Sequence, residues 1–592
     1  MRQLRNPSRL VSFIAGGLLA AGFFELDQSS VGAEIAFLAP WTASSPGELN
    51  TWLAFVLLLT PGATLLAWSL APQLAALLAR ITSWLGSRTK SQRKVVLAAV
   101  GATAFAAYGL LQSWVSRGYP LLDEIASARF GGRVLAMGRL RLEVPDCWQS
   151  LPHLYLHARD GFVTSFDWLG IQLAWALAEV SHTGAWVFAG LSAATLIALM
   201  SVISRGLGFA WGILGGIAFV LSPMALTLSV SNHAHIGSRL ALALTLLAFV
   251  YAQGTASRRR WTAVGLSLGL GLLFRPLEVS LLLVPLLVSM CVGSTKESNA
   301  AGAFVWTLAG CLPSLVLMAW HNSEVTGHSW LFARFAHNDF LEASNLKSQP
   351  PWAIFTNTAL LWNRFGANFM YNLQQLIIWV LGPLGALCFA CGVTANRLTR
   401  PLAMGIGLAL LLALAHDDSG LHVFGPLHYS DAVIPALIVA VYGLERATRI
   451  LHAHLSVAGR DIAIAVCVGM LCAAGGLSRR QLQALHQQGV IHEAIHSAAW
   501  DKKFNHSVVL APPYEMLWKR QLPTLSSMDS HLRHWQPSHP RLNDRVVFAH
   551  ALPGALTELS RCFPDRRFFR LYNDAQSGSL QTQELPRSDD SH

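Results

Sequence analysis

Two adjacent carboxylates, Asp123 and Glu124, are the residues of this sequence best suited to chemistry. They directly follow an apolar run, in the stretch YPLLDE at 119–124. Charged groups at a membrane are costly, and neighbouring residues on a helix point apart, so the two acids are expected to have different roles. Acids at a helix start also complement the helix dipole, and the residues alone leave this structural interpretation equally open.

Arg275 and Glu278 border the bilayer between two apolar runs. The planar fork of an arginine presents several donors at fixed geometry, which suits a phosphate. Snorkelling towards the lipid headgroups, with Glu278 as a neighbour, is the structural alternative. Groups able to hold an anion also lie at two further predicted helix ends: His233, His235 and Arg239 at one, His428 and Tyr429 at the other. With Asp123, these residues describe a site where a phosphorylated lipid meets a nucleophile.

Histidine spacing raises the question of a metal. His153 and His157 are four residues apart and could share a helix face, but no third ligand is evident and we favour ordinary surface polarity. A looser cluster in the tail consists of His531, His534 and His539. It has no acidic or cysteine partner at a recognised spacing. No cofactor is therefore predicted, and a divalent metal is left open.

The composition requires membrane-spanning elements to position these residues. The chain has 592 residues, of which 53% are hydrophobic and 13% charged, and its mean hydropathy is +0.42. Soluble domains contain about 25% charged residues, so a water-soluble globule and a disordered chain are both excluded. We predict an all-α polytopic bundle with thirteen spans, at 10–24, 51–73, 95–116, 183–204, 207–227, 238–254, 262–274, 277–293, 302–320, 373–395, 402–416, 432–447 and 461–478. The Arg275-Pro276 pair separates two of them, because proline ends or kinks a helix.

Basic residues indicate the orientation of the bundle. The short loops 25–50, 228–236 and 417–431 contain no Lys or Arg, whereas the alternate connections are rich in both. The positive-inside rule then places the N-terminus in the cytoplasm, and the loops 117–182 and 321–372 and the tail outside. The net charge of +11 is accordingly explained by topology and is no sign of nucleic-acid binding. The first span also resembles a signal peptide, and we favour an uncleaved anchor.

The chain divides into three predicted parts. Residues 1–94 form a transmembrane hairpin with a basic cytoplasmic loop, 95–478 the main membrane domain, and 479–592 a soluble external domain. β-like runs at 507–510, 546–549 and 568–572, with a helical stretch at 554–562, predict a small α/β domain in the tail. Cys147 and Cys562 are both expected outside and could pair, but we favour unpaired thiols.

Several motifs resemble one known family. The run LLDEIASARFGGRVLAMGRLRLEVP at 121–145 resembles the Asp-Glu loop of bacterial C-type membrane glycosyltransferases, the group that includes protein mannosyltransferases and lipid A aminoarabinose transferases. Further matches follow in the same order: SNHAHIGSRLAL (231–242), GLGLLFRPLEVSLLLVPLLV (269–288), HNSEVTG (321–327), FGPLHYSDAVIPAL (424–437) and LNDRVVFAHALPGALTELSRCFPDRRFFRLY (542–572). They extend over most of the chain, which makes the resemblance specific for the fold.

The resemblance implies a sugar donor carried on polyprenyl phosphate and an envelope acceptor, which meet at the outer face of the bacterial inner membrane. On this basis Asp123 is the expected general base and Glu124 a secondary acid. The lipid phosphate would be bound by Arg275, with the help of three other residues: His235, Arg239 and His428.

Two departures from the family pattern stand out. Related sequences show Tyr-Pro-Pro-Gly where this chain has TSFDWLG at 164–170, and Gly-Pro-Arg-Tyr where it has Gly-Pro-Leu-His-Tyr at 425–429. The missing arginine weakens phosphate binding unless His428 or Arg239 replaces it. These changes leave open a different lipid or acceptor, or a loss of activity.

The sequence therefore predicts a glycosyltransferase, either a hexosyl- or a pentosyltransferase, that acts on a glycan, lipid or protein acceptor. The alternatives are a transporter or flippase of a lipid-linked saccharide and an inactive scaffold of an envelope assembly. Transporters tend to show inverted repeats and broken helices near the bilayer midplane, and neither is evident in the sequence. The expected functional charges lie instead at one face.

Overall fold

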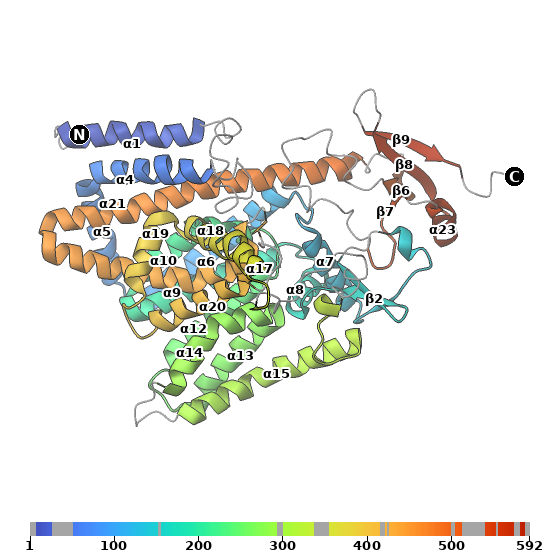
Figure 1. Cartoon of the computed structure of the whole chain (residues 1–592), viewed down its shortest axis with the longest axis horizontal. Helices are drawn as coiled ribbons and strands as arrows, with labels where there is room; N and C mark the ends of the chain where they lie inside the picture. Colours follow the sequence, from blue (N-terminus) through green and yellow to red (C-terminus); the bar gives the residue numbers. More distant parts are fainter. Residues whose placement is uncertain are drawn as a thin grey trace.

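The computed structural model of the chain is a helical bundle with small sheets at one end (Figure 1). The structure describes residues 7–25, 51–151, 155–292, 300–336, 355–414, 421–422, 425–498, 504–511, 539–551, 554–573 and 580–586. The N-terminal helix α1 (Pro7–Glu25) packs along α4 (Thr60–Ser69), and α4 packs in turn on the long helix α21 (Val433–Ala498) (Figure 1).

Seven helices in the described residues are long and apolar enough to cross a membrane. They are α1 (Pro7–Glu25), Thr51–Ser69 with α4 (Thr60–Ser69) as its second part, α6 (Lys90–Ser116), α9 (Trp186–Leu207), α12 (His235–Ala252), α15 (Ala300–Thr326) and α21 (Val433–Ala498). The number rises to nine if each of two bent helix pairs is one span. The predicted helical bundle is confirmed, whereas the count of thirteen spans is not.

The difference from thirteen has two sources in the described helices. Three helices lie at predicted spans but are too short, or too polar at one end, to cross a membrane: α13 (Arg258–Phe274), α14 (Pro276–Val292) and α20 (Thr399–Leu411). Helix α21 joins two predicted spans, since its arms meet at Ser456, whose φ of 48° and ψ of −119° are not helical. Figure 1 shows the chain turning back at this end of the bundle, near α5 (Ala71–Gly86).

Two spans are bent sharply. Helices α10 (Phe209–Leu221) and α11 (Pro223–Ser229) meet at 69°, and the segment α17 (Thr358–Arg364) to α18 (Tyr371–Val380) meets α19 (Gly382–Gly392) at 100°. The breaks lie together, because the Ser222 hydroxyl donates a hydrogen bond of 3.2 Å to the Trp379 carbonyl. The absence of broken helices inferred from the sequence is therefore wrong. Neither break lies at a charged residue, and a Pro follows each within two positions.

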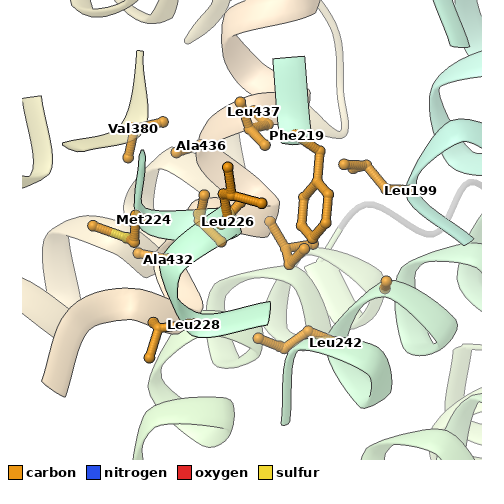
Figure 2. Close-up of a cluster of buried hydrophobic side chains, with 14 of the residues drawn as sticks. Leu199, Phe219, Met224, Leu226, Leu228, Leu242, Val380, Ala432, Ala436 and Leu437 are labelled. Atoms are coloured by element: carbon orange, nitrogen blue, oxygen red, sulfur yellow. The ribbon is translucent and has the colours of Figure 1, made fainter. Parts of the chain in front are cut away.

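Apolar side chains fill the space around the first break (Figure 2). Phe219 comes from α10, Met224, Leu226 and Leu228 from α11, and Val380 from α18, and all of them are buried. Close packing of side chains from α10, α11, α18 and neighbouring helices here fixes the bend against straightening.

The loop 117–182, predicted to lie outside and called the outer loop below, contains helices and a small sheet. It begins with α7 (Asp123–Ala136) and ends with the apolar helix α8 (Leu169–Val180). Between them β1 (Leu142–Glu143), β2 (Leu156–Arg159) and β3 (Phe162–Ser165) form an antiparallel sheet in the order β1-β3-β2. Helix α7 packs on this sheet through buried apolar side chains: Phe130, Val134, Leu142, Leu156 and Val163.

The tail forms the small α/β unit that its pattern predicts. Strands β6 (Ser507–Ala511), β7 (Val546–His550), β8 (Arg567–Asn573) and β9 (Leu580–Leu585) form one sheet in the order β7-β6-β8-β9, and α23 (Ala555–Cys562) packs against it. β6 pairs in parallel with β7 and β8, and β9 is antiparallel to β8. The unit lies at the same end of the bundle as α7 and β2 (Figure 1).

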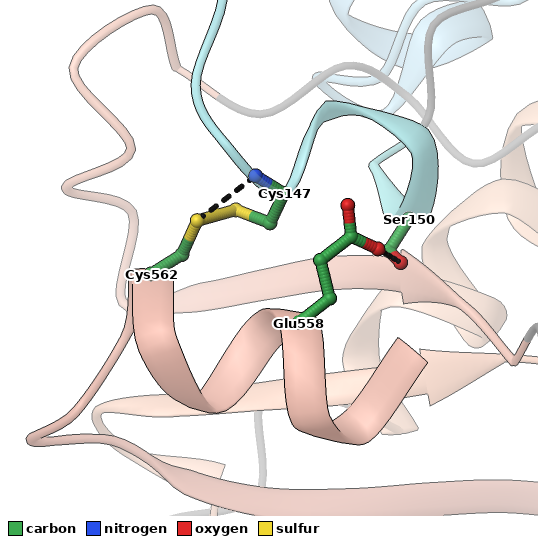
Figure 3. Close-up of a disulfide and its surroundings, with 4 residues drawn as sticks. All are labelled: Cys147, Ser150, Glu558 and Cys562. Carbon is green, nitrogen blue, oxygen red and sulfur yellow. Dashed lines mark hydrogen bonds between the residues drawn. A yellow bond between two sulfur atoms is a disulfide. The ribbon is translucent and has the colours of Figure 1, made fainter. Parts of the chain in front are cut away.

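A disulfide joins Cys147 of the outer loop to Cys562 at the end of α23, with a Cα–Cα distance of 6.1 Å (Figure 3). Ser150 donates a 2.6 Å hydrogen bond to Glu558 beside it. The favoured interpretation of unpaired thiols is therefore wrong. Sequence spacing could not reveal a bond across 415 residues, because it depends on how the tail docks.

We expect mass spectrometry to find this bond in purified protein. Denaturation with an alkylating agent but without reductant should leave Cys147 and Cys562 unmodified, while Cys391, an exposed free thiol, becomes labelled. Labelling of all three cysteines would show that the bond is absent. Replacing Cys147 by Ser should lower the melting temperature, since removing a native disulfide costs about 2–5 kcal/mol in small extracellular domains, whereas Cys391→Ser should not.

Candidate active site

The paired acids lie at the start of α7, at the end of the bundle that carries the outer loop. Asp123 is the first residue of the helix and Glu124 the second. The side chain of Asp123 lies outside the described part of the structure. The backbone of Leu122 is extended before the helix, so the chain turns into α7 at the acids. The different roles expected for the two carboxylates stay a prediction.

Glu124 is held from two sides. Its Oε1 accepts a hydrogen bond of 2.9 Å from the Arg334 guanidinium, and its Oε2 lies 2.8 Å from His233 Nε2. Arg334 follows α15 in the second outer loop, and His233 precedes α12. The Arg334 guanidinium also lies 4.9 Å from the centre of the Phe166 ring. One carboxylate therefore ties together both outer loops and the outer end of α12.

Asp167 is a third carboxyl of this cluster, and the sequence interpretation missed it. Its side chain is 5% exposed, and its Oδ1 accepts the Trp168 N–H at 2.8 Å at the start of α8. Burial raises the pKa of Asp167, and the charge of Glu124 raises it further. The available signal was an acid directly before the apolar run at 169–180, within the stretch that departs from the family pattern.

The charge of Arg334 is fixed by these acids. Burial alone lowers the pKa of Arg334, but the carboxylates of Glu124 and Asp167 outweigh burial, and the net shift is upward. A guanidinium between two carboxylates is charge-compensated. It can orient a substrate, but it is a weak site for a further anion.

A second cluster surrounds Asp431, which the sequence interpretation also missed. Its Oδ1 accepts a 2.8 Å hydrogen bond from Ser238, and its Oδ2 lies 3.2 Å from His235 Nδ1 and 3.9 Å from Arg275 Nε. Arg275 is also paired with Glu278, and Asp431 is 1% exposed. The structure thus brings the predicted phosphate ligands Arg275 and His235 together around one buried carboxylate.

The two clusters are neighbours. The rings of His233 and His235 stack with centroids 4.9 Å apart and an angle of 18° between their planes. His233 belongs to the Glu124 cluster and His235 to the Asp431 cluster. The backbone of Asn232 just before them has a φ of 60°, a left-handed conformation that costs free energy for a residue other than glycine. The turn directly precedes the two imidazoles, of which His233 contacts Glu124 and His235 contacts Asp431.

The other two predicted phosphate ligands lie around the Asp431 cluster. Arg239 is fully buried and donates hydrogen bonds to the carbonyls of His235 and Ala225, at 3.2 and 3.1 Å. The second bond satisfies a carbonyl just beyond the bend between α10 and α11. His428 is half-buried and lines a small cavity together with Glu278 and Asp431. Their role towards a phosphate stays a prediction.

A metal-binding site was sought among the side chains of the described residues. No three His, Cys, Asp or Glu residues in the described ranges are placed to hold a metal ion. His157 lies in strand β2, so a helix face shared with His153 is wrong for His157. It is also buried, so the favoured interpretation of surface polarity is wrong for it as well. His153, His531 and His534 lie outside the described residues. Glu124, Asp431 and Glu278 are instead engaged by Arg, His and Ser side chains.

The raised pKa of Asp167 leads to a stability prediction. Below the unfolded value near 4, Asp167 is protonated in both states; as the pH rises, the unfolded state ionises first and stability is lost. The neutral variant Asp167→Asn should therefore melt higher than wild type at pH 7.5, by roughly 1–3 °C, and the difference should shrink towards pH 4. Thermal unfolding in detergent at both pH values tests this; a lower melting temperature of the variant at pH 7.5 would contradict it.

Comparison with known proteins gives matches to solved structures alone: no protein-family model and no curated protein sequence matches the chain. The crystal structure of ArnT from Cupriavidus metallidurans bound to undecaprenyl phosphate matches with 14% sequence identity and a TM-score of 0.49, over 84% of this chain and 99% of ArnT. The crystal structure of the same ArnT in the apo state matches with 16% sequence identity and a TM-score of 0.47, over 83% of this chain and 99% of ArnT.

The archaeal oligosaccharyltransferase AglB from Archaeoglobus fulgidus, in complex with an inhibitory peptide and a dolichol-phosphate, matches with 13% identity and a TM-score of 0.37, over 64% of this chain and 56% of AglB. These similarities to an ArnT and to an archaeal oligosaccharyltransferase stand beside the resemblance of the sequence motifs to C-type membrane glycosyltransferases.

Proposed function

We propose that the chain is a glycosyltransferase that moves a sugar from a polyprenyl-phosphate donor to an envelope acceptor at the outer face of the inner membrane. The observation that carries this proposal is the position of Glu124 beside Asp123 at the start of α7. Both oxygens of Glu124 are engaged, by Arg334 and His233. We therefore assign the general base to Asp123 and a positioning role to Glu124, in agreement with the family resemblance.

In the proposed reaction, the anomeric carbon of the sugar forms a bond to the acceptor and loses its bond to the lipid phosphate. The Asp123 carboxylate takes the proton of an acceptor hydroxyl or amine as its oxygen or nitrogen attacks the anomeric carbon. The bond from that carbon to the phosphate oxygen breaks, and the lipid phosphate leaves with the electron pair. Arg275 would stabilise the growing negative charge, with His235, Arg239 and His428 nearby. Because Arg275 already pairs with Glu278 and Asp431, a phosphate would share or replace these partners.

The donor class is inferred from the neighbours and the resemblance. ArnT is bound to undecaprenyl phosphate and AglB to a dolichol-phosphate, both lipid carriers. We extend a lipid-phosphate donor to this chain because its apolar helices surround a charged cluster at one end. Whether the sugar is a hexose or a pentose, and whether the acceptor is a glycan, lipid or protein, remain open parts of the proposal.

We place the outer loop and the tail in the periplasm and the N-terminus in the cytoplasm. The Cys147–Cys562 disulfide supports this orientation, because such bonds persist in oxidising compartments. The disulfide requires both segments to be on one side of the membrane, which agrees with the distribution of basic residues.

A transporter or flippase of a lipid-linked saccharide is the second candidate. The two bent spans that meet at Ser222 and Trp379 favour it, because transporters form their sites at interrupted helices. The acidic cluster at the outer end favours transfer chemistry instead. A flippase would move a fluorescent polyprenyl-phosphate saccharide across proteoliposomes without making a new glycosidic bond, whereas a transferase would make the bond.

Replacing Asp123 by Asn should lower the rate of transfer about 100- to 10,000-fold, since a general base contributes this much. The assay uses purified protein in nanodiscs, a panel of undecaprenyl-phosphate hexoses and pentoses, and a crude envelope extract as acceptor, with products identified by mass spectrometry. Asp160→Asn is the matched control, because Asp160 is an exposed acid of the same loop. Equal rates for Asp123→Asn and wild type would show that Asp123 is not the base.

Replacing Arg275 by Ala should raise the donor concentration needed for half-maximal rate, by about 10- to 100-fold, because a charged hydrogen bond to the phosphate is lost. Arg275→Lys should recover part of the loss, since it keeps the charge without the planar fork. The control is Arg205→Ala, an exposed arginine at the end of α9. An unchanged donor dependence would reject Arg275 as a phosphate ligand.

A further inference from the structure

We propose that the polar side chains clustered around Asp167 form a pocket for the sugar ring of the donor, and that Asp167 accepts hydrogen bonds from its hydroxyl groups. This inference rests on the proposed function and makes it more specific. The pocket is defined by Glu124, Asp167, Arg334, His233 and Trp168, and is called the Asp167 pocket below. Neither the sequence motifs nor the matched structures assign a role to Asp167.

Buried polar atoms without partners are the first reason. The Trp168 indole Nε1, His233 Nδ1 and Asn232 Oδ1 have no hydrogen-bond partner in the described part of the chain. All three side chains are more than nine-tenths buried, with exposed fractions of 7%, 2% and 8%. Trp168 directly follows Asp167, and Asn232 directly precedes the His233 that contacts Glu124. An unsatisfied buried polar atom costs about 1–3 kcal/mol, so three of them on residues of this cluster or next to it in the chain point to a polar ligand. They offer donors and acceptors together, as a hydroxyl-rich ligand requires.

The aromatic surroundings are the second reason. Trp168 packs edge-to-face against Phe332 and Phe335, with centroids 5.0 and 6.3 Å apart. Phe166 stacks on Tyr155 at 4.7 Å and lies beneath the Arg334 guanidinium. Rigid aromatic walls with a few placed polar groups are typical of small-ligand sites, and the faces of sugar rings are apolar enough to pack on them.

The charges of the Asp167 pocket favour binding of a sugar over binding of a phosphate. Arg334 is the guanidinium of the pocket, and Glu124 bonds it directly while the charge of Asp167 also acts on it. A phosphate placed here would face two carboxylates. Sugar hydroxyls, in contrast, donate to carboxylates. The Asp431 cluster next to it contains Arg275, so one donor molecule can place its sugar at the Asp167 pocket and its phosphate towards Arg275 across the stacked His233 and His235 rings.

The test compares lipids with and without a sugar. Full-length protein in nanodiscs is titrated with undecaprenyl phosphate and with a panel of undecaprenyl-phosphate hexoses and pentoses, and affinities are taken from shifts in thermal unfolding. For the sugar that binds best, wild type should bind the sugar-bearing lipid more tightly than the bare lipid. Asp167→Asn should lose about 10- to 100-fold in affinity for the sugar-bearing lipid and stay within about twofold for the bare lipid.

Asp167→Asn keeps the shape of the side chain, and its amide oxygen can still accept the Trp168 N–H. If this variant does not fold, Trp168→Phe removes the unpaired N–H and keeps an aromatic ring; it should weaken sugar-dependent binding about 3- to 10-fold. Asp160→Asn is the control and should bind both lipids as wild type does. Donors that lack single hydroxyls identify the bonded group, because the deoxy compound should lose affinity for wild type but not for Asp167→Asn.

Each outcome decides the proposal. Full retention of the sugar-dependent affinity in Asp167→Asn and Trp168→Phe would place the sugar elsewhere and overturn it. Equal affinity of wild type for bare and sugar-bearing lipids would overturn it as well, while lipid-phosphate recognition would stand. Failure of wild type to bind undecaprenyl phosphate at all would reject the donor class itself, and with it this inference.

Discussion

The structure of the outer end depends on the double engagement of Glu124. A partly buried carboxylate must be compensated, and here one cation and one imidazole from two distant segments do this. Removing either partner would leave a charge in a poorly hydrated place, which costs more than the pair contributes. These contacts therefore connect the outer loops to the start of α12, next to the Asp431 cluster.

A second constraint follows from placing charges among apolar helices. In the described clusters each buried carboxylate lies near a guanidinium or an imidazole: Glu124 and Asp167 near Arg334, and Asp431 and Glu278 near Arg275. Pairing with a cation offsets the cost of burying each carboxylate in the protein interior. The paired groups form two neighbouring regions that differ in their side chains. One is rich in acids and aromatic rings, and the other combines an arginine with histidines next to the spans.

Local signals predicted the parts of this site that depend on local sequence. Asp123 and Glu124 begin a helix directly after the apolar stretch at 119–122. Arg275 lies between two helices because the proline that follows it interrupts the helix. The partners were missed because tertiary structure selects them: Arg334 is 210 residues from Glu124, and Asp431 is 193 from Ser238. The bends at Ser222 and Leu381 were missed for a related reason, since a proline near an apolar run also fits a straight helix end.

The disulfide between Cys147 and Cys562 constrains how the protein can be made. Its two sulfurs are 415 residues apart in the chain, and the segment between them contains most of the membrane helices. The bond requires both cysteines to lie on the same side of the membrane, so it can close only after the intervening helices have been inserted with Cys147 and α23 on one side. In the proposed orientation, Cys147 would wait as a thiol until α23 has crossed the membrane. A molecule with a misinserted span would keep the two thiols on opposite sides and could not form the bond.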